Sequence, residues 1–269
     1  MGQGLANVGV LIKQVALGWL VYRLTDSAIL LGLVMFCREI AAFVTSPFAG
    51  VIADRLNKYQ LLIVANLLLL ANASLLGFLV INGYINLLWL VFIQIIFGCI
   101  GGAEIPTRQA FINDLVENKE NLTNAIAFNS TLFNTARIVG PAIAGMLIPI
   151  IGEGFCFLLY AVLLAFILII FGFIRYRADK KTMPEKNFRR EMQEGIHYAY
   201  QSESIRTLLL LFASVTFFGI SYEMLLPVFA EEIFQAGSQG YGYMTSAIGV
   251  GSVLGAIFIA NRKDLFGLE

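Results

Sequence analysis

The chain has 269 residues, and its 18 basic and 18 acidic side chains give a formal net charge of zero. Hydrophobic residues make up 58% of the chain and charged residues only 13%, which excludes an ordinary soluble domain, where roughly a quarter of the residues are charged. The zero net charge says nothing about an acidic partner, and we expect no binding to nucleic acid.

Apolar runs long enough to cross a bilayer occur eight times along the chain. A helix rises about 1.5 Å per residue, so about 20 apolar residues span the hydrocarbon layer. The first run is too long for a cleavable signal peptide and has no small-residue cleavage site. We predict an all-α integral membrane protein with spans at 5–22, 29–53, 60–81, 87–106, 123–149, 154–174, 207–227 and 241–260.

Lysine and arginine are distributed unevenly among the connections between these spans. One alternate set of connections contains only Arg23, whereas the other contains fourteen basic residues, beginning with Arg55, Lys58 and Arg108. Because basic residues accumulate on the cytoplasmic side, we predict a multi-pass protein of the cell (inner or plasma) membrane with a cytoplasmic amino terminus. Four aromatic residues are expected in a belt at the opposite interface: Trp19, Tyr22, Tyr84 and Trp89.

The second span carries two adjacent charges near its middle, Arg38 and Glu39. A single charge at the bilayer centre costs on the order of 3 kcal/mol or more, so both groups must face protein or water. Lys13 and Arg137 lie at a comparable depth if the helices are straight, and either could pair with Glu39. Two interpretations stay open: a static ion pair, or a Glu39 that binds and releases protons.

A short charged turn, 50–58, separates the second and third spans. Asp54, Arg55 and Lys58 cannot lie together in the hydrocarbon layer, so we predict this turn at a membrane surface. Gly50 permits the close approach of a neighbouring helix, and Asn57 suits a tight reversal of the chain. We interpret the turn as a hinged or gated cytoplasmic corner.

The fourth span ends in a proline-containing segment, Glu104 to Arg108. Proline at position 106 cannot donate a backbone hydrogen bond and disfavours a continuing helix. We therefore interpret this segment as a helix stop that carries a charge pair at the cytoplasmic surface.

The fifth span combines a polar face and a small-residue face. At about 100° per residue, each set falls on one side of a helix, roughly a quarter turn from the other. The polar side is expected to line water or substrate, and the small side to permit close helix contact. The alternative of a simple packing notch stays open. The polar face holds Ser130, Asn134, Arg137 and Pro141, and the small face holds Ala136, Gly140 and Ala144.

A long polar stretch, 175–206, follows the sixth span and predicts a division into two membrane parts. Apolar residues recur at helical spacing within 188–204, as in an amphipathic surface helix or a solvated linker helix. We predict a six-helix part at 1–174, a cytoplasmic linker at 175–206 and two helices of a second part at 207–269. In that second part, Glu223 is either a cavity residue or an interfacial one.

At these residues the chain resembles the major facilitator superfamily, in particular its exporter branch with enterobactin-type siderophore exporters and macrolide efflux proteins. The charged turn is similar to the family's loop motif Gly-x-x-x-Asp-Arg-x-Gly-Arg-Arg, at Gly50, Asp54, Arg55 and Lys58. Asn57 and Tyr59 depart from that motif. The fifth span is similar to the antiporter motif Gly-x-x-x-Gly-Pro-x-x-Gly-Gly. Its matching positions are Gly140, Pro141 and Gly145, with Ala136 and Ala144 as small substitutes.

The resemblance implies export by alternating access, commonly driven by proton antiport. It also implies a cytoplasmic gate at the charged turn and a close contact between two halves at Gly140, Pro141 and Gly145. Gln94 stands where the family's fourth-helix arginine is expected, which puts proton coupling through that position in doubt. Because the family has twelve helices, we expect this chain to be an amino-terminal part of a longer, monomeric protein.

The sequence therefore predicts a transporter that exports small amphipathic compounds of the drug, macrolide or siderophore type. Its expected partners are this substrate, protons and the lipid bilayer. The cavity and proton-coupling candidates are Glu39, Arg38, Gln94, Ser130, Asn134, Arg137 and Glu223. Two alternatives are an uncoupled facilitator or lipid translocator, and a non-transporting membrane fragment or scaffold. We expect no enzyme, cofactor or metal, because no Ser-His pair, His-Glu-x-x-His motif or paired intramembrane aspartates occur.

Overall fold

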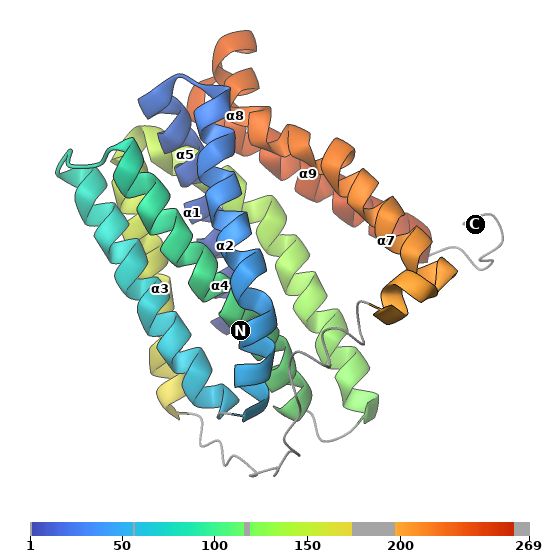
Figure 1. Ribbon diagram of the computed structural model, residues 1–269. Helices are drawn as coiled ribbons and strands as arrows, with labels where there is room; N and C mark the ends of the chain where they lie inside the picture. The colour runs from blue at the N-terminus through green and yellow to red at the C-terminus, as the bar shows by residue number, and fades with distance from the viewer. Residues whose placement is uncertain (1, 56, 116–118, 174–196, 261–269) are drawn as a thin grey trace.

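The computed structural model describes residues 2–55, 57–115, 119–173 and 197–260, and within these ranges every regular element is helical (Figure 1). The prediction of an all-α membrane architecture is confirmed. Seven helical segments in this part of the chain are long and apolar enough to cross a membrane, and one of them contains two of the predicted spans.

The first four helices run alternately up and down, and their ends follow the predicted turns (Figure 1). Asp26, with a φ of 45°, lies between α1 and α2, and Gly83, with a φ of 71°, follows α3. Asn57 caps α3 because its side-chain oxygen accepts a hydrogen bond from the Tyr59 N–H. The bounds are α1 Gly2–Thr25, α2 Ala28–Arg55, α3 Lys58–Ile81 and α4 Leu87–Leu115.

Helix α4 does not stop at Pro106, so the predicted helix stop is wrong. The helix continues to Leu115. Proline removes one backbone donor, but helices in membranes tolerate this because nearby groups satisfy the backbone. Next to it, the Thr107 hydroxyl donates to the Ala103 carbonyl oxygen at 2.7 Å. The expected charge pair does form, with 3.5 Å between Arg108 Nε and Glu104 Oε1, but it lies within a continuing helix.

The fifth and sixth predicted spans form α5, Lys119–Phe173, which is broken at Gly152. Gly152 has a φ of 81° and a ψ of 165°, a conformation that glycine adopts without steric cost. The two arms run in opposite directions: the first follows α1, with Leu132 beside Gly4, and the second returns along α3, with Gly154 beside Ile81. The sequence prediction of two spans is therefore correct in substance.

The predicted span 207–227 is a composite of short helical types rather than one regular helix. Pro227 supplies no N–H and is buried, so the α-helical pattern changes around it. The linker helix expected at 188–204 lies mostly outside the described residues, and α7 already begins within the predicted linker. The elements are α7 Glu203–Val215, η1 Thr216–Ile220, η2 Ser221–Leu225, α8 Leu226–Val228, η3 Phe229–Ile233 and α9 Gly237–Ala260.

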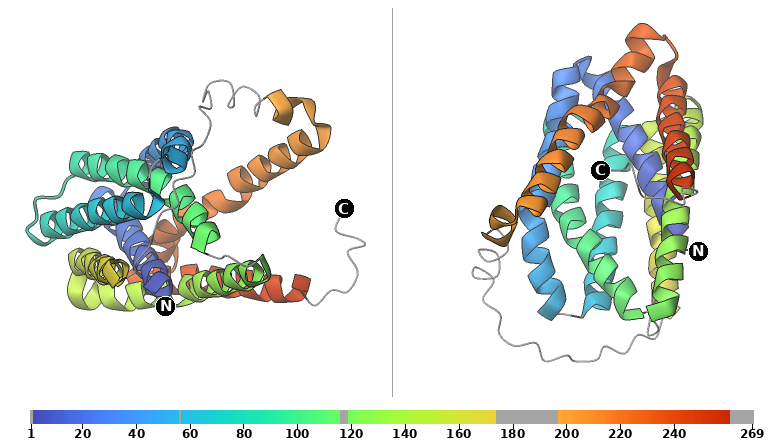
Figure 2. Two further views of the ribbon diagram at one scale, coloured as in Figure 1. Left: turned by 90° about the horizontal axis from the view of Figure 1, so that it is seen from below. Right: turned by 90° about the vertical axis from the view of Figure 1, so that its right-hand side faces the viewer.

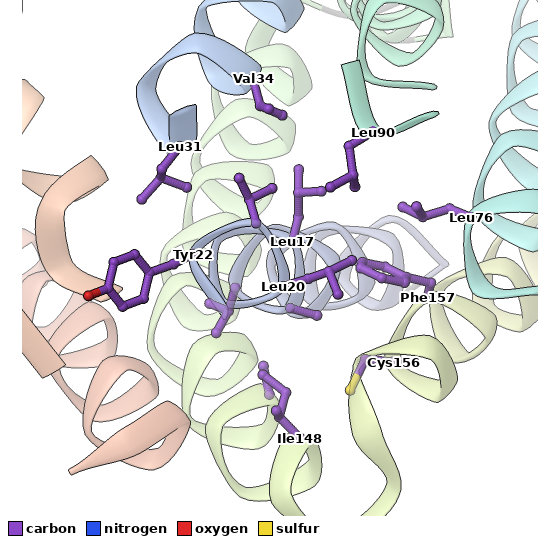
Figure 3. Packing of buried hydrophobic residues seen from close by; sticks show 14 of the residues in the cluster. Leu17, Leu20, Tyr22, Leu31, Val34, Leu76, Leu90, Ile148, Cys156 and Phe157 are labelled. Atoms are coloured by element: carbon purple, nitrogen blue, oxygen red, sulfur yellow. The ribbon is translucent and has the colours of Figure 1, made fainter. Parts of the chain in front are cut away.

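Helix α1 is the centre of the packing. It contacts α2, α4, α5, α8 and α9, and its residues Leu17 and Leu20 are completely buried. Figure 3 shows these side chains among Leu76 of α3, Leu90 of α4 and Phe157 of α5. Lipid is as apolar as leucine, so close packing between helices rather than transfer out of water stabilises this core.

The later helices meet the first group at one end and diverge at the other. We call the end at Asp26 the α1–α2 end and the end at Asn57 the α2–α3 end. Both views in Figure 2 show α9 following α5, while α7 separates from α9 toward the α2–α3 end. Helix α7 has no buried residue. The surface between α1–α5 and α7–α9 is therefore the place to look for a functional site.

Candidate functional site

Helices α5 and α9 approach each other closely along a row of glycines. A Cβ added to Gly145 would lie 3.0 Å from Gly242 Cα, and one added to Gly242 would lie 2.5 Å from the Pro141 carbonyl oxygen. Further along, a Cβ on Gly249 would lie 2.7 Å from the Arg137 carbonyl oxygen. No side chain fits between these backbones. We call this contact the α5–α9 seam.

The remaining small residues of the fifth span face α1 instead. A Cβ on Gly140 would lie 2.9 Å from Leu11 Cβ, and Ala136 and Ala144 are buried. The family resemblance implied that Gly140 and Gly145 lie at one contact between two halves. The structure places them against different neighbours, because five residues correspond to about 500°, so they point about 140° apart around the helix.

The α1–α2 end is closed by polar contacts between distant parts of the chain. The Tyr22 hydroxyl donates to Glu232 Oε1 at 2.6 Å and joins α1 to η3. Arg23 Nε lies 2.8 Å from Glu153 Oε1, beside the break in α5. Tyr22 is only 4% exposed, so its expected place in the aromatic belt is wrong. Its hydroxyl binds a protein carboxylate rather than the membrane interface.

Replacing Tyr22 with phenylalanine should loosen the α1–α2 end. A hydrogen bond to a charged group contributes on the order of 1.5–3 kcal/mol, and partial exposure of Glu232 reduces this to about 1 kcal/mol. With cysteine at the buried position Ala230, we expect a water-soluble maleimide to react about fivefold faster in Tyr22→Phe. The control is Tyr243→Phe, which removes an exposed hydroxyl. Equal reaction rates in the two variants would contradict a latch at Tyr22.

Charged side chains meet at the surface between the two groups of helices. Arg137 of α5 lies 3.8 Å from Glu223 of η2, and each side chain is about one-third exposed. Arg38 Nε donates to Glu39 Oε1 at 2.9 Å within α2. The expected pairing of Glu39 with Lys13 or Arg137 is therefore wrong. An adjacent arginine needs no tertiary approach to reach the carboxylate, and Glu39 remains exposed.

The other candidate lining residues are divided between this surface and the core. Ser130 is exposed and Asn134 is half-buried on the first arm of α5. Gln94 of α4 is 0% exposed and lies inside the first group of helices, away from the Arg137–Glu223 pair. The structure thus brings Arg137 and Glu223 together but does not bring Gln94 to them.

Lys13 is the polar residue that sequence reasoning undervalued. It is 1% exposed in the middle of α1, and its Nζ lies 3.0 Å from the centroid of the Phe97 ring. The available signal was a single lysine inside an apolar span, which the sequence analysis treated only as a partner for Glu39. Its real neighbours are on α4.

The comparisons with known proteins agree with this helical arrangement. A family described as transmembrane secretion effectors, of the major facilitator type, matches residues 2–269. The chain belongs to this family. As a major facilitator protein, it is a multi-pass membrane protein.

Individual relatives of this chain are bacterial transporters. The staphyloferrin A transporter of Staphylococcus aureus is 27% identical over 97% of this chain and 66% of its own length. Macrolide efflux protein A of Streptococcus pyogenes is 24% identical over 99% and 65%. The multi-drug resistance efflux pump PmrA of Streptococcus pneumoniae is 25% identical over 88% and 57%. The chain spans about two thirds of the length of the first two of these relatives.

The major facilitator loop motif lies where α2 meets α3. The side chains of Gly50, Asp54 and Arg55 lie outside the described residues, although α2 continues to position 55. Lys58 begins α3 and is half-buried. The gate predicted at this motif stays a prediction.

Proposed function

We propose that this major facilitator protein exports small amphipathic molecules across the cell membrane by alternating access, in exchange for protons. The parts at 1–174 and 207–269, joined by the linker at 175–206, move against each other and expose a central site to one side at a time. Asp54, Arg55 and Lys58 gate the α2–α3 end, which the distribution of basic residues assigns to the cytoplasm.

The observation that carries this proposal is that the two groups of helices meet at the α1–α2 end and diverge toward the α2–α3 end (Figure 2). Near the α1–α2 end, Tyr22, Ala230, Ser238 and Tyr241 are buried. Toward the α2–α3 end, α7 has no buried residue, and α9 is largely exposed beyond Gly249. A protein closed at one end and open at the other has the form expected of one state of an alternating transporter.

The charges between the helices support a small polar or amphipathic substrate. Arg38, Glu39, Arg137 and Glu223 stand in the middle of otherwise apolar helices, and each is partly exposed. Charges at membrane depth mark substrate or ion pathways. The named relatives handle a siderophore, macrolides and several drugs, so we propose substrates of these chemical types for this protein.

Efflux measurements test the function directly. The protein is expressed from its complete reading frame in cells that lack their own multidrug exporters, and the cells are loaded with ethidium or radiolabelled erythromycin. We expect faster loss of at least one compound than from empty-vector cells, and we expect a proton uncoupler to abolish the difference. Efflux that continues down a concentration gradient despite the uncoupler would favour the facilitator alternative, with which an uncharged Gln94 is compatible.

The Arg137–Glu223 pair provides a sharper test of the lining. Half-exposed ion pairs contribute about 0–1 kcal/mol, so Arg137→Gln and Glu223→Gln should each change the thermal unfolding midpoint by less than about 3 °C. If the pair lines the pathway, each variant should nevertheless lower efflux at least fivefold. The double variant should be no worse than the poorer single one, because the two groups act together. Unchanged efflux in both single variants would remove the pair from the pathway.

A further inference from the structure

A buried polar group lies between α1 and α4, outside the surface that contains the Arg137–Glu223 pair. Its centre is Lys13, whose Nζ has no hydrogen-bond acceptor among the described residues. The amide nitrogen and oxygen of Gln94 likewise have no partner in this part of the structure. Both side chains are essentially unexposed, at 1% and 0%. Buried polar groups without partners are rare in folded proteins and call for a physical reason.

Lys13 and Gln94 belong to one local cluster. Lys13 contacts the ring of Phe97, and Gln94 precedes Phe97 by three residues, so both α4 side chains lie on the same face in adjacent turns. The Gln94 amide, one turn before Phe97 on α4, offers an acceptor and two donors, whereas a charged lysine has only donors. The components of a polar contact are therefore present, but the contact is not made in the arrangement that the structure describes.

The surroundings of Lys13 do not balance a positive charge. A buried ammonium group needs a counter-ion or hydrogen-bond acceptors, and the Phe97 ring offsets only part of its lost hydration. Arg38 lies on α2, whose backbone meets α4 at Gly98 next to Phe97, and its charge has the same sign. Among the described residues, the acidic side chains that form ion pairs in the neighbouring elements have other partners: Glu39 with Arg38, Glu104 with Arg108, Glu153 with Arg23 and Glu223 with Arg137.

We propose that Lys13 carries the exchanged proton, and that Gln94 positions it. This inference rests on the proposed export by proton exchange. With the α2–α3 end open, Lys13 is an amine that has given its proton to cytoplasmic water. When the α1–α2 end opens, the Nζ lone pair takes a proton from hydronium on the outer side, leaving water and an ammonium group. The ammonium donates to Gln94 Oε1, and the return motion releases the proton inward.

The proposal assigns different roles to Lys13 and Glu39. Glu39 is exposed and bonded to the neighbouring arginine in the open arrangement, so its carboxylate is already balanced. Lys13 is buried and unbalanced, so gaining or losing a proton changes which arrangement is favoured. A conformational equilibrium linked to a single proton changes by at most about tenfold per pH unit.

Distance measurements on the purified full-length protein test the inference without a substrate. In a background without native cysteines, nitroxide labels replace the exposed residues Tyr84 and Phe234, both at the α1–α2 end. In lipid nanodiscs, the ratio of short to long distances should change between pH 5 and pH 9, by up to about tenfold per unit. Lys13→Met should abolish this change, and at every pH its label distances should be distributed as in the wild type at high pH. Lys13→Arg stays charged, so at every pH its label distances should be distributed as in the wild type at low pH.

Glu203→Gln, at an exposed position of α7, is the matched control and should retain the response to pH. If Lys13→Met retains that response, or if the wild type shows none, the inference is overturned. If Glu39→Gln alone loses it, Glu39 is the proton carrier. Monodisperse elution and an unchanged helical spectrum establish that each variant is folded.

Transport measurements distinguish a failure of the inference about Lys13 from a failure of the proposed function. In proteoliposomes, ethidium movement driven by an imposed pH gradient should fall at least tenfold in Lys13→Met, while exchange of ethidium without a gradient persists. Wild-type transport that ignores the gradient would refute proton exchange itself. Gradient-driven transport by both the wild type and Lys13→Met would refute only the role of Lys13.

Discussion

We expect Gly242→Leu to abolish the proposed export without preventing membrane insertion. The α5–α9 seam has no room for a side chain at this position, because a Cβ would lie 2.5 Å from the Pro141 carbonyl oxygen and 2.7 Å from Gly145 Cα. Both of these atoms belong to the backbone, so no side-chain rotation relieves the clash. Helix α9 must move away from α5, and the closed α1–α2 end must open with it.

The consequence of that movement can be measured. At equal amounts of membrane protein, we expect the efflux rate of Gly242→Leu to fall at least twentyfold. The matched control is Gly251→Leu on the same helix, where an added Cβ meets nothing within 4 Å; it should transport at close to the wild-type rate. Equal loss of export in both variants would mean that the effect comes from leucine in α9 and not from the seam.

The helices were predictable because the membrane imposes a simple requirement. A span needs about 20 apolar residues and must satisfy its own backbone hydrogen bonds. The predicted run 60–81 accordingly corresponds to helix α3, Lys58–Ile81. The errors came at proline. Pro106 did not end α4, and Pro227 lies within a mixture of helical types, since the outcome depends on which neighbouring groups satisfy the freed carbonyls.

The candidate site was predictable residue by residue, but its pairings were not. Arg137 stands out as a charge in an apolar span, and no local pattern indicates that its partner is Glu223. Tyr22 and Glu232 are 210 residues apart and meet only because α1 lies next to η3. By contrast, Arg38 and Glu39 are neighbours in sequence, and the wrong expectation there came from searching for a distant partner.

The small residues show the same limit. Their spacing correctly indicated that α5 makes close contacts, since glycine and alanine let membrane helices approach. Spacing alone cannot state which helix is approached. Gly140 faces α1 and Gly145 faces α9, and this division depends on the packing of all three helices.

The strongest effect on folding is expected at Gly98 of α4. A Cβ there would lie 2.1 Å from the Arg38 carbonyl oxygen, well inside van der Waals contact with the backbone of α2. One turn further, a Cβ on Gly102 would lie 2.5 Å from the Ala42 carbonyl oxygen. Helices α2 and α4 are therefore in backbone contact over at least one turn, and a leucine at position 98 would force them apart.

This separation should lower stability more than a core substitution that only adds volume. Overpacking costs about 1–3 kcal/mol even where side chains can adjust, and here they cannot, so we expect about 3 kcal/mol or more for Gly98→Leu. For a protein of this size that corresponds to a midpoint about 6–12 °C lower in detergent. Gly101→Leu is the control, because its Cβ would meet nothing within 4 Å. A midpoint in Gly98→Leu within about 2 °C of this control would show that α2 and α4 are not in direct backbone contact. Because α2 also carries Arg38 and Glu39, the same separation would displace these charges relative to α4 and should lower efflux together with stability.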